Sequence, residues 1–299
     1  MSRRGIWFGI SAYTMWGIFP VYFKALQQVP ALEIVFHRVV WSFLFVAILI
    51  LMRHEWADLK DQIADPRIWL TYTLAAILLA LNWLVYIYAI NAGHVVEGSL
   101  GYFINPLLSV ALGVVFLREK LRPAQWIPVG MAAVGVLYLT ALYGAIPWIA
   151  LALAFTFGLY GLLKKVAPLG SLYGLTVETA ILFLPALGYL IFIDRHGTAA
   201  FGHMGWGTSL LLSAAGVITA LPLLLFASAA RSIPLYMVGI LQYIAPTGQF
   251  LLGVLLYHEP FTPARLVGFS VIWAALAFYW LESWQARRAM LRSHSGGYV

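Results

Sequence analysis

Ionisable side chains are rare inside the apolar stretches of this chain, and those that occur there could bind a solute or couple its movement to an ion. Glu33, His37 and Arg38 open one apolar stretch, and Lys24 closes the stretch before it. The spacing of four residues stacks Glu33 above His37 on one helix face. We expect a charged gate or a cation–carboxylate pair that breaks when a solute enters. The alternative is an interfacial cluster in which Lys24 and Arg38 extend toward water.

Two further carboxyl groups are candidates for coupling. Glu178 lies inside another apolar stretch, roughly 8 Å from its start at a rise of 1.5 Å per residue, and burial favours the protonated form of a carboxyl group. It could therefore load and release a proton, unless it makes only a structural hydrogen bond or pairs with Lys164 or Lys165. Glu97 begins a different stretch, where it could line a cavity or simply stabilise a helix N-terminus.

Proline, aromatic and amide side chains form a second set of candidates, for binding a solute. Pro106 and Pro246 each remove a backbone hydrogen bond inside a helix, which makes them candidate hinges beside a binding site. The alternatives are that proline is merely tolerated in membrane helices and that aromatic stripes pack or face lipid. The residues expected to bind substrate are Tyr13, Trp16, Asn82, Trp83, Tyr86, Tyr102, Asn105, Gln242 and Tyr243.

The composition indicates that the elements carrying these groups lie in lipid. Of 299 residues, 63% are hydrophobic and 10% are charged, whereas soluble domains carry about 25% charged residues. Cysteine is absent, which excludes disulfides, thiolate metal sites and cysteine nucleophiles. The net charge of +7 comes from basic residues scattered between apolar runs, so no nucleic-acid partner is expected. We also expect no cofactor, no metal and no obligate protein partner.

Ten stretches are long and apolar enough to cross a bilayer, which takes roughly 20 residues. They predict an all-α polytopic membrane protein with ten transmembrane helices. The segment 285–299 is expected to be a disordered, basic, cytoplasmic tail. The approximate bounds of the ten spans are Gly5–Leu26, Ala31–Met52, Ile68–Asn91, Val95–Leu117, Ala124–Leu142, Ile146–Leu163, Tyr173–Ile193, Trp206–Ala227, Leu235–Tyr257 and Ala264–Trp284.

The distribution of lysine and arginine tests this number of spans independently, because these residues concentrate in cytoplasmic loops. With ten spans and both termini inside, 14 of the 18 basic residues fall on the cytoplasmic side. Losing one span would scramble that alternation. The asymmetry therefore favours ten spans with both termini cytoplasmic.

An internal repeat divides the chain into two five-helix halves, residues 5–142 and 146–284. At an offset of 140 residues, eight of 22 positions match between 103–124 and 243–264. Because five spans is an odd number, the second half is expected to be inverted relative to the first. Inverted repeats place a substrate site near the middle of the membrane and allow its two faces to open alternately. The matches are Ile104/Ile244, Pro106/Pro246, Leu112/Leu252, Gly113/Gly253, Val114/Val254, Glu119/Glu259, Pro123/Pro263 and Ala124/Ala264.

Two helix-end patterns and one early motif resemble the drug/metabolite transporter superfamily, its EamA family and, within that, the RarD branch. The resemblance covers nearly the whole chain and implies the ten-helix, 5+5 inverted-repeat fold of a bacterial inner-membrane protein. Similar proteins export amino acids, toxic compounds or other metabolites. The patterns are Asn105-Pro106…Gly113…Glu119…Pro123, its echo Pro246…Gly253…Glu259…Pro263, and Gly17-Ile18-Phe19-Pro20…Lys24 followed by Glu33…Arg38.

These features predict a secondary transporter that moves a small metabolite, amino acid or amphipathic drug-like solute by alternating access, through export or gradient-driven exchange. Proton coupling is a candidate energy source. The alternatives are a channel, which is more usually built from rings of like groups, or a membrane-embedded enzyme. An enzyme is disfavoured because all four aspartates lie in loops or at stretch ends and no zinc-hydrolase or P-loop motif occurs.

Overall fold

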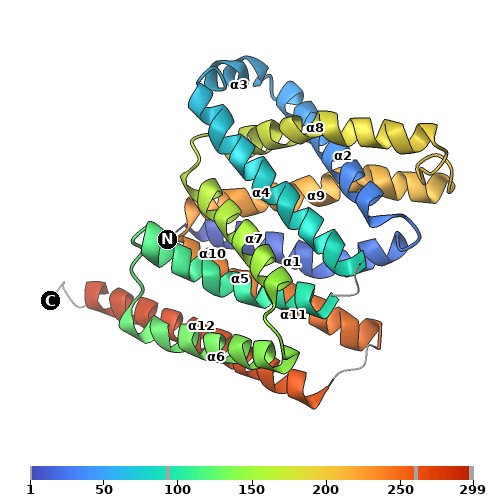
Figure 1. Ribbon diagram of the computed structural model, residues 1–299. Coiled ribbons are helices and arrows are strands. Elements are labelled where there is room, and N and C mark those ends of the chain that lie inside the picture. The colour runs from blue at the N-terminus through green and yellow to red at the C-terminus, as the bar shows by residue number, and fades with distance from the viewer. Residues whose placement is uncertain (1, 92–94, 259–261, 296–299) are drawn as a thin grey trace.

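Helices account for the regular structure of residues 2–91, 95–258 and 262–295, the part of the chain that this computed structural model describes (Figure 1). Side chains of residues 90–99, 143, 265 and 286–295 are outside that description. The helices are α1 (Arg3–Ala25), α2 (Ala31–Met52), α3 (Trp56–Gln62), α4 (Pro66–Asn91), α5 (Val95–Phe116), α6 (Trp126–Tyr143), α7 (Trp148–Val166), α8 (Ser171–Arg195), α9 (Trp206–Ser232), α10 (Leu235–Gln242), α11 (Ile244–Leu251) and α12 (Pro263–Ser295).

Eight helices within these residues are long and apolar enough to cross a membrane. They are α2, α4, α6 with its preceding turn, α7, α8, α9, the segment from α10 through α11 to Leu256, and the apolar part of α12. The predicted first span, α1, is not in this set, and the apolar part of α5, Leu100–Phe116, is shorter. The number of ten spans therefore stays a prediction.

Local sequence explains where several helices begin and end. The Ser2 hydroxyl accepts a hydrogen bond from the Gly5 amide (3.2 Å) and caps α1. Pro30 directly precedes α2, a position that suits proline because the first helical N–H groups have no partner within the helix. Gly144 ends α6 with a φ of +78°, a left-handed conformation that glycine adopts without strain.

The predicted ninth span is continuous in sequence but divided in the structure. Helix α10 ends at Gln242, α11 begins at Ile244, and a π-helical turn, Leu252–Leu256, follows. Pro246 has no N–H to donate to the Gln242 carbonyl, which accounts for the interruption. Pro106, by contrast, lies inside the uninterrupted helix α5. Of the two candidate hinges, only Pro246 therefore coincides with a break in a helix.

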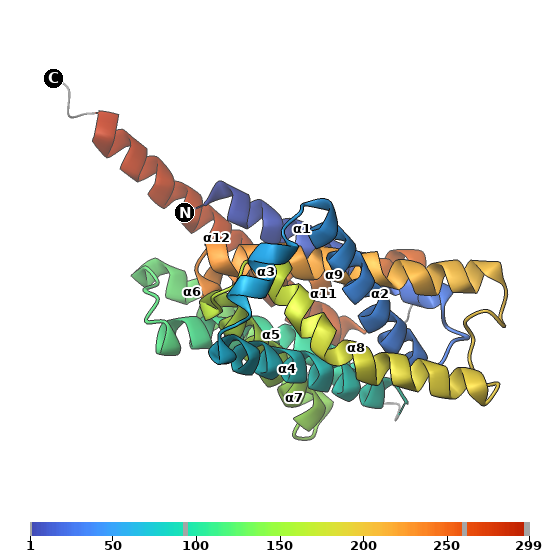
Figure 2. The same cartoon turned by 90° about the horizontal axis from the view of Figure 1, so that it is seen from above.

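The C-terminal helix is longer than the sequence analysis anticipated. Helix α12 continues past Trp284 to Ser295, and its end projects away from the other helices (Figure 2). Helical backbone thus occupies most of 285–299, for which we predicted disorder. The physical reason is local, since residues 285–292 are mainly Gln, Ala, Arg, Met and Leu, all of which favour helices. The short helix α3, between α2 and α4, was also not anticipated.

Helices from the two halves of the chain pack against one another. Helix α1 lies against α9 and α11, and α7 lies against α4 and α5. Helix α2 packs on α8, α5 packs on α10, and α6 and α12 run side by side at one edge of the molecule (Figure 1). This arrangement brings polar residues from distant parts of the sequence to one central region.

The contact between α2 and α9 depends on a glycine. A Cβ atom added to Gly216 would overlap the backbone of Trp41, and the Ser42 hydroxyl donates a hydrogen bond to the Gly216 carbonyl (3.1 Å). Small residues let membrane helices approach closely enough for such contacts. This approach positions the neighbouring Arg38 and Thr219, which belong to the site described below.

Candidate functional site

A cavity of about 460 Å³, here called the central cavity, lies among α1, α2, α4, α5, α7, α9, α10 and α11. It extends from the connection between α1 and α2, where Gln27 and Val29 line it, to Gln242 and Pro246 at the α10–α11 break. Binding sites for small molecules usually occupy about 300–1,000 Å³. The central cavity is therefore large enough to hold a small solute.

The structure gathers most of the predicted substrate-binding residues around the central cavity. They come from α1, α4, α5 and α10, so no single segment of sequence defines the site. Pro246 and Arg38 also line it. Substrate binding by these residues stays a prediction. The predicted residues at the cavity are Tyr13, Trp16, Asn82, Trp83, Tyr86, Tyr102, Asn105 and Gln242.

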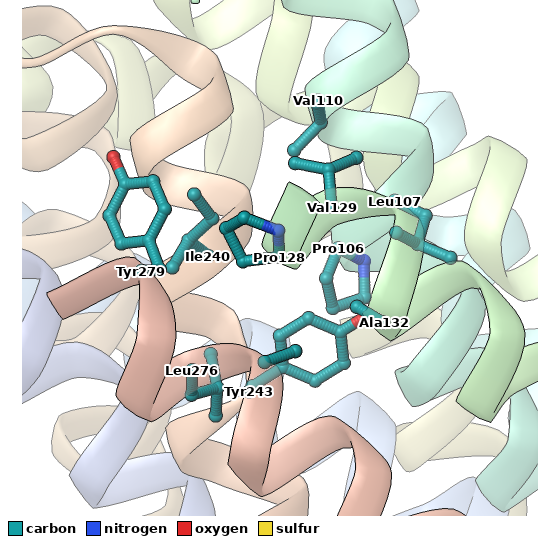
Figure 3. Close-up of a pocket in the computed structure, with 11 residues that line it drawn as sticks. Pro106, Leu107, Val110, Pro128, Val129, Ala132, Ile240, Tyr243, Leu276 and Tyr279 are labelled. Atoms are coloured by element: carbon teal, nitrogen blue, oxygen red, sulfur yellow. The ribbon is translucent and has the colours of Figure 1, made fainter. Parts of the chain in front are cut away.

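Tyr243 and Pro106 lie elsewhere. Both line a small, mostly apolar pocket of about 20 Å³ between α5, α6, α10 and α12 (Figure 3). The Tyr243 hydroxyl donates to the Phe103 carbonyl (3.4 Å). Neighbours in a helical segment point in directions about 100° apart, given 3.6 residues per turn. Gln242 can thus face the central cavity while Tyr243 does not.

Two buried polar atoms beside the central cavity, Tyr13 Oη and Asn105 Oδ1, have no hydrogen-bond partner among the residues that the structure describes. Asn82 differs, because its Nδ2 donates to the Leu153 carbonyl and to Thr156 Oγ1, both at 2.9 Å. Buried polar groups in proteins are nearly always hydrogen-bonded. The two unpartnered atoms are therefore candidates for contact with a bound solute or its water.

Arg38 of α2 lines the central cavity. Its Nε donates to Thr219 Oγ1 on α9 (2.9 Å), and its Cζ lies 4.5 Å from the centroid of the Trp83 ring. Among the side chains that the structure describes, Arg38 takes part in no ion pair. Packing on an aromatic face stabilises the cation only partly.

The other residues of the expected charged gate have separate contacts. Glu33 is buried, and its Oε1 accepts hydrogen bonds from the amides of Ala200 (2.8 Å) and Phe201 (3.1 Å). His37 Nε2 lies 3.8 Å from the same oxygen, in agreement with the predicted i,i+4 stacking. Lys24 is exposed, with its Nζ 3.6 Å from the centroid of the Tyr257 ring. No contact joins Lys24 to Glu33 among the described side chains.

Glu178 forms a buried cluster with two residues of α7. Its Oε1 accepts from Lys164 Nζ at 2.7 Å, and its Oε2 accepts from the Tyr160 hydroxyl at 3.1 Å. Glu178 and Lys164 are 0% and 3% exposed. Lys164 was one of the two partners predicted for Glu178 from the sequence, and that pairing is present. Glu97, the remaining coupling candidate, has a side chain outside the described residues.

The end of the bundle opposite the α1–α2 connection is joined by polar contacts that the sequence did not reveal. This end is called the Glu119 end. Glu119 Oε1 and Oε2 accept hydrogen bonds from the amides of Leu235 (2.7 Å) and Tyr236 (2.9 Å), at the start of α10. Lys165 Nζ donates to the Ile233 carbonyl (2.5 Å). Glu119 stood out only as part of a helix-end pattern, and nothing in that pattern identified a partner 116 residues away.

Other contributors to the site were also missed. Thr219, which orients Arg38, and Gln249, which donates to the Trp16 carbonyl (3.1 Å), lie in stretches that showed no polar pattern. Phe157 packs edge-on against Trp16, with ring centroids 5.7 Å apart. A single polar residue or another aromatic ring in an apolar helix gives no signal of which way it faces.

Long apolar helices around a central cavity that polar side chains partly line define a multi-pass membrane protein built like a transporter. Residues 3–141 match the EamA-like transporter family. Together with near-full-length relatives, this match shows that the chain belongs to that family, as a RarD-like member of the drug/metabolite transporter superfamily.

The relatives cover almost the whole chain. Protein RarD of Streptomyces exfoliatus is 46% identical over 98% of this chain and 92% of its own length. The uncharacterized transporter YojE of Bacillus subtilis strain 168 is 48% identical, with 98% of each chain covered. Protein RarD of Escherichia coli K12 is 41% identical over 96% of this chain and 97% of its own.

A solved crystal structure shares the fold. It superposes with a TM-score of 0.71 at 19% identity and covers 93% of this chain and 97% of the other. At that identity the likeness concerns the fold alone.

Proposed function

We propose that this protein is a secondary transporter that carries a small metabolite, amino acid or amphipathic solute across the inner membrane by alternating access, through export or gradient-driven exchange. The proposal rests on the position of the central cavity between the two ends of the bundle. The cavity reaches the α1–α2 connection, whereas the Glu119 end is joined by hydrogen bonds. A channel would need a path open at both ends, and an enzyme would need a catalytic group in the cavity.

Ten spans in two inverted halves, 5–142 and 146–284, are part of this proposal. The helix pairing supports them. In such a repeat α1 corresponds to α7, and α4 corresponds to α9. The contact of α1 with α9 then has its counterpart in that of α7 with α4. The contact of α5 with α7 likewise corresponds to that of α10–α11 with α1. Reciprocal pairs of this kind are expected of two halves related by a pseudo-twofold axis.

The proposed orientation places both termini in the cytoplasm. The α1–α2 connection then lies outside the cell and the Glu119 end lies inside. The excess of lysine and arginine on the predicted cytoplasmic side supports this assignment. In this orientation the central cavity opens outward, and transport requires a second state in which the Glu119 end separates.

Proton coupling through Glu178 belongs to the same proposal. Glu178 is enclosed with Lys164 rather than lining the central cavity. Opening of the Glu119 end would admit water to this cluster, because Lys164 lies in the last turn of α7, next to Lys165 of that end. Glu178 could then exchange a proton in one state and be sealed in the other. Residues Lys24, Glu33, His37 and Glu97 complete the proposed gate.

Cysteine labelling tests alternating access without knowledge of the substrate, because the natural chain contains no cysteine. Gln27→Cys places a thiol at the mouth of the central cavity. Ser228→Cys places one near the Glu119 end, where the Ser228 hydroxyl donates a hydrogen bond to Ser171 Oγ. We expect a membrane-impermeant maleimide to reach the first from one face and the second from the other.

The decisive measurement is the dependence between the two sites. A bulky adduct at Gln27→Cys should hold the mouth open and slow the labelling of Ser228→Cys in the double variant. Labelling of both thiols from the same face would contradict alternating access. So would a rate of Ser228→Cys labelling that is the same with and without the bulky adduct. A small adduct at Gln27→Cys serves as the matched control.

A further inference from the structure

Arg38 is the only charged residue among the described residues that line the central cavity. A charge removed from water is costly unless it is paired, and charges within membrane segments survive mainly where they pair or contact water. The cavity therefore carries a net positive charge that the described protein does not neutralise.

Nearby acidic groups are already committed to other contacts. Glu33, on the same helix, accepts from the amides of Ala200 and Phe201 through Oε1, and its buried Oε2 makes no hydrogen bond to the described residues, Arg38 included. Glu178, on the adjacent helix α8, is paired with Lys164. Helix α9, which packs on the other side of α2, offers Arg38 the neutral hydroxyl of Thr219. Among the described side chains, no acidic group on α2 or on the helices packed against it forms an ion pair with Arg38.

The geometry of Arg38 suits a carboxylate. Its Nε is occupied by Thr219, while Nη1 and Nη2 make no hydrogen bond to the described residues. These two terminal nitrogens match the two oxygens of a carboxylate in an end-on, bidentate arrangement. The Trp83 ring, whose centroid lies 4.5 Å from Cζ, restrains the guanidinium beside the cavity that both residues line.

The remainder of the lining suits an apolar or aromatic body without a positive charge. Trp16, Phe157 and Tyr86 supply ring surfaces. Asn105 and Gln242 can form hydrogen bonds but carry no negative charge, so an ammonium group would enter a positive cavity uncompensated.

We propose that the central cavity selects organic monoanions in which a carboxylate is attached to an aromatic or other apolar body, with Arg38 as the carboxylate-binding residue. The inference rests on the proposed function, because it names the solute class for the same site. It separates such monoanions from amines and from zwitterionic amino acids.

Ligand binding to the purified full-length protein tests this selection with four probes that share one phenyl body. They are 3-phenylpropionate, 3-phenylpropionamide, 3-phenylpropylamine and phenylalanine. We expect the melting temperature to rise with 3-phenylpropionate at concentrations at least about tenfold lower than with any other probe, as a charge-assisted pair predicts. In Arg38→Gln the anion should lose this advantage and bind like the amide. The exposed cation Arg195 provides the control, because Arg195→Gln should keep the preference.

Arg38→Lys keeps the test decisive if the glutamine variant does not fold. It retains the charge but loses the bidentate pair, so the anion should still rank first with lower affinity. Equal binding of the four probes, stronger binding of the amine or phenylalanine, no binding of any probe, or an anion preference unchanged in Arg38→Gln would overturn the proposal. A preference that emerges only after Glu97→Gln would also overturn it. Any of these results would leave the proposed function to the cysteine-labelling experiment, which uses no solute.

Discussion

Arg38 and Glu178 are separated by 140 residues, the offset of the internal repeat, yet they occupy opposite environments. Arg38 lines the central cavity with no ion pair among the described side chains, whereas Glu178 is enclosed with Lys164 at 2.7 Å. If the two ends of the bundle open in turn, Arg38 makes the cavity wall cationic in one state. In the other state the wall would also include Glu178 with its partner Lys164. A solute would therefore bind at Arg38, whereas a proton would bind at Glu178.

Substitution of either Lys164 or Glu178 should destabilise the protein. Removing one partner from a buried ion pair leaves an uncompensated charge, and we expect Lys164→Met or Glu178→Gln to lower the free energy of unfolding by roughly 3–5 kcal/mol. The double variant should recover most of this loss. Unfolding of the purified protein in detergent measures all three. A double variant as unstable as the sum of the single ones would contradict the pairing.

Glu178 should make opening of the Glu119 end depend on pH. Protonation removes the carboxylate charge and weakens its attraction to Lys164, so labelling of Ser228→Cys should rise as the pH falls. In Glu178→Gln this dependence should disappear. Because maleimide chemistry itself varies with pH, each rate is divided by that of the exposed His196→Cys variant. An unchanged pH profile in Glu178→Gln would remove this residue from the coupling mechanism.

Loss of the Glu119 carboxylate should loosen the end that it holds. Glu119→Gln can accept fewer and weaker hydrogen bonds from the Leu235 and Tyr236 amides, and we expect a loss of about 1–3 kcal/mol in stability. Labelling of Ser228→Cys should become several-fold faster. Glu282→Gln is the control, because Glu282 pairs with the partly exposed Arg122 and such pairs contribute about 0–1 kcal/mol. Equal effects in both variants would contradict a specific clamp.

Two glycines in long apolar helices should respond in opposite directions to alanine. Gly216→Ala places a methyl group against the Trp41 backbone and should destabilise the protein by about 1–3 kcal/mol. Gly188 is exposed on α8, and no atom of the described residues lies within 4 Å of an added Cβ. Gly188→Ala should therefore stabilise its helix by roughly 0.5–1 kcal/mol. Melting temperatures of the two variants check the difference, and destabilisation by both would refute this packing.

Whether the number of spans is even, as ten spans require, can be tested at the ends of the chain. Arg4→Cys and Ser293→Cys should react with an impermeant reagent from the same face in oriented vesicles, while His196→Cys should react from the other face. Reaction of the two terminal thiols from opposite faces would require an odd number of spans. The ten-span, inverted-repeat proposal would then fail.

Much of the helical layout could be predicted because its causes are local. The ends of α2, at Ala31 and Met52, agree with the predicted span, since a proline precedes it and a polar turn follows it. The direction in which a side chain points from its helix was harder to predict. Gln242 and Tyr243 were assigned one role, but only Gln242 lines the central cavity, because neighbouring residues in a helical segment point in different directions.

The sequence by itself determined that this chain belongs in a membrane and approximately where its helices run. The reason is that the free energy of transfer into lipid is a sum over the residues of each segment. Only the tertiary structure decided the environment of each polar group. Glu119 holds the start of α10, Lys164 neutralises Glu178, and Arg38 is left facing the central cavity. These outcomes depend on contacts between helices distant in sequence, and an isolated helix carries no record of its neighbours.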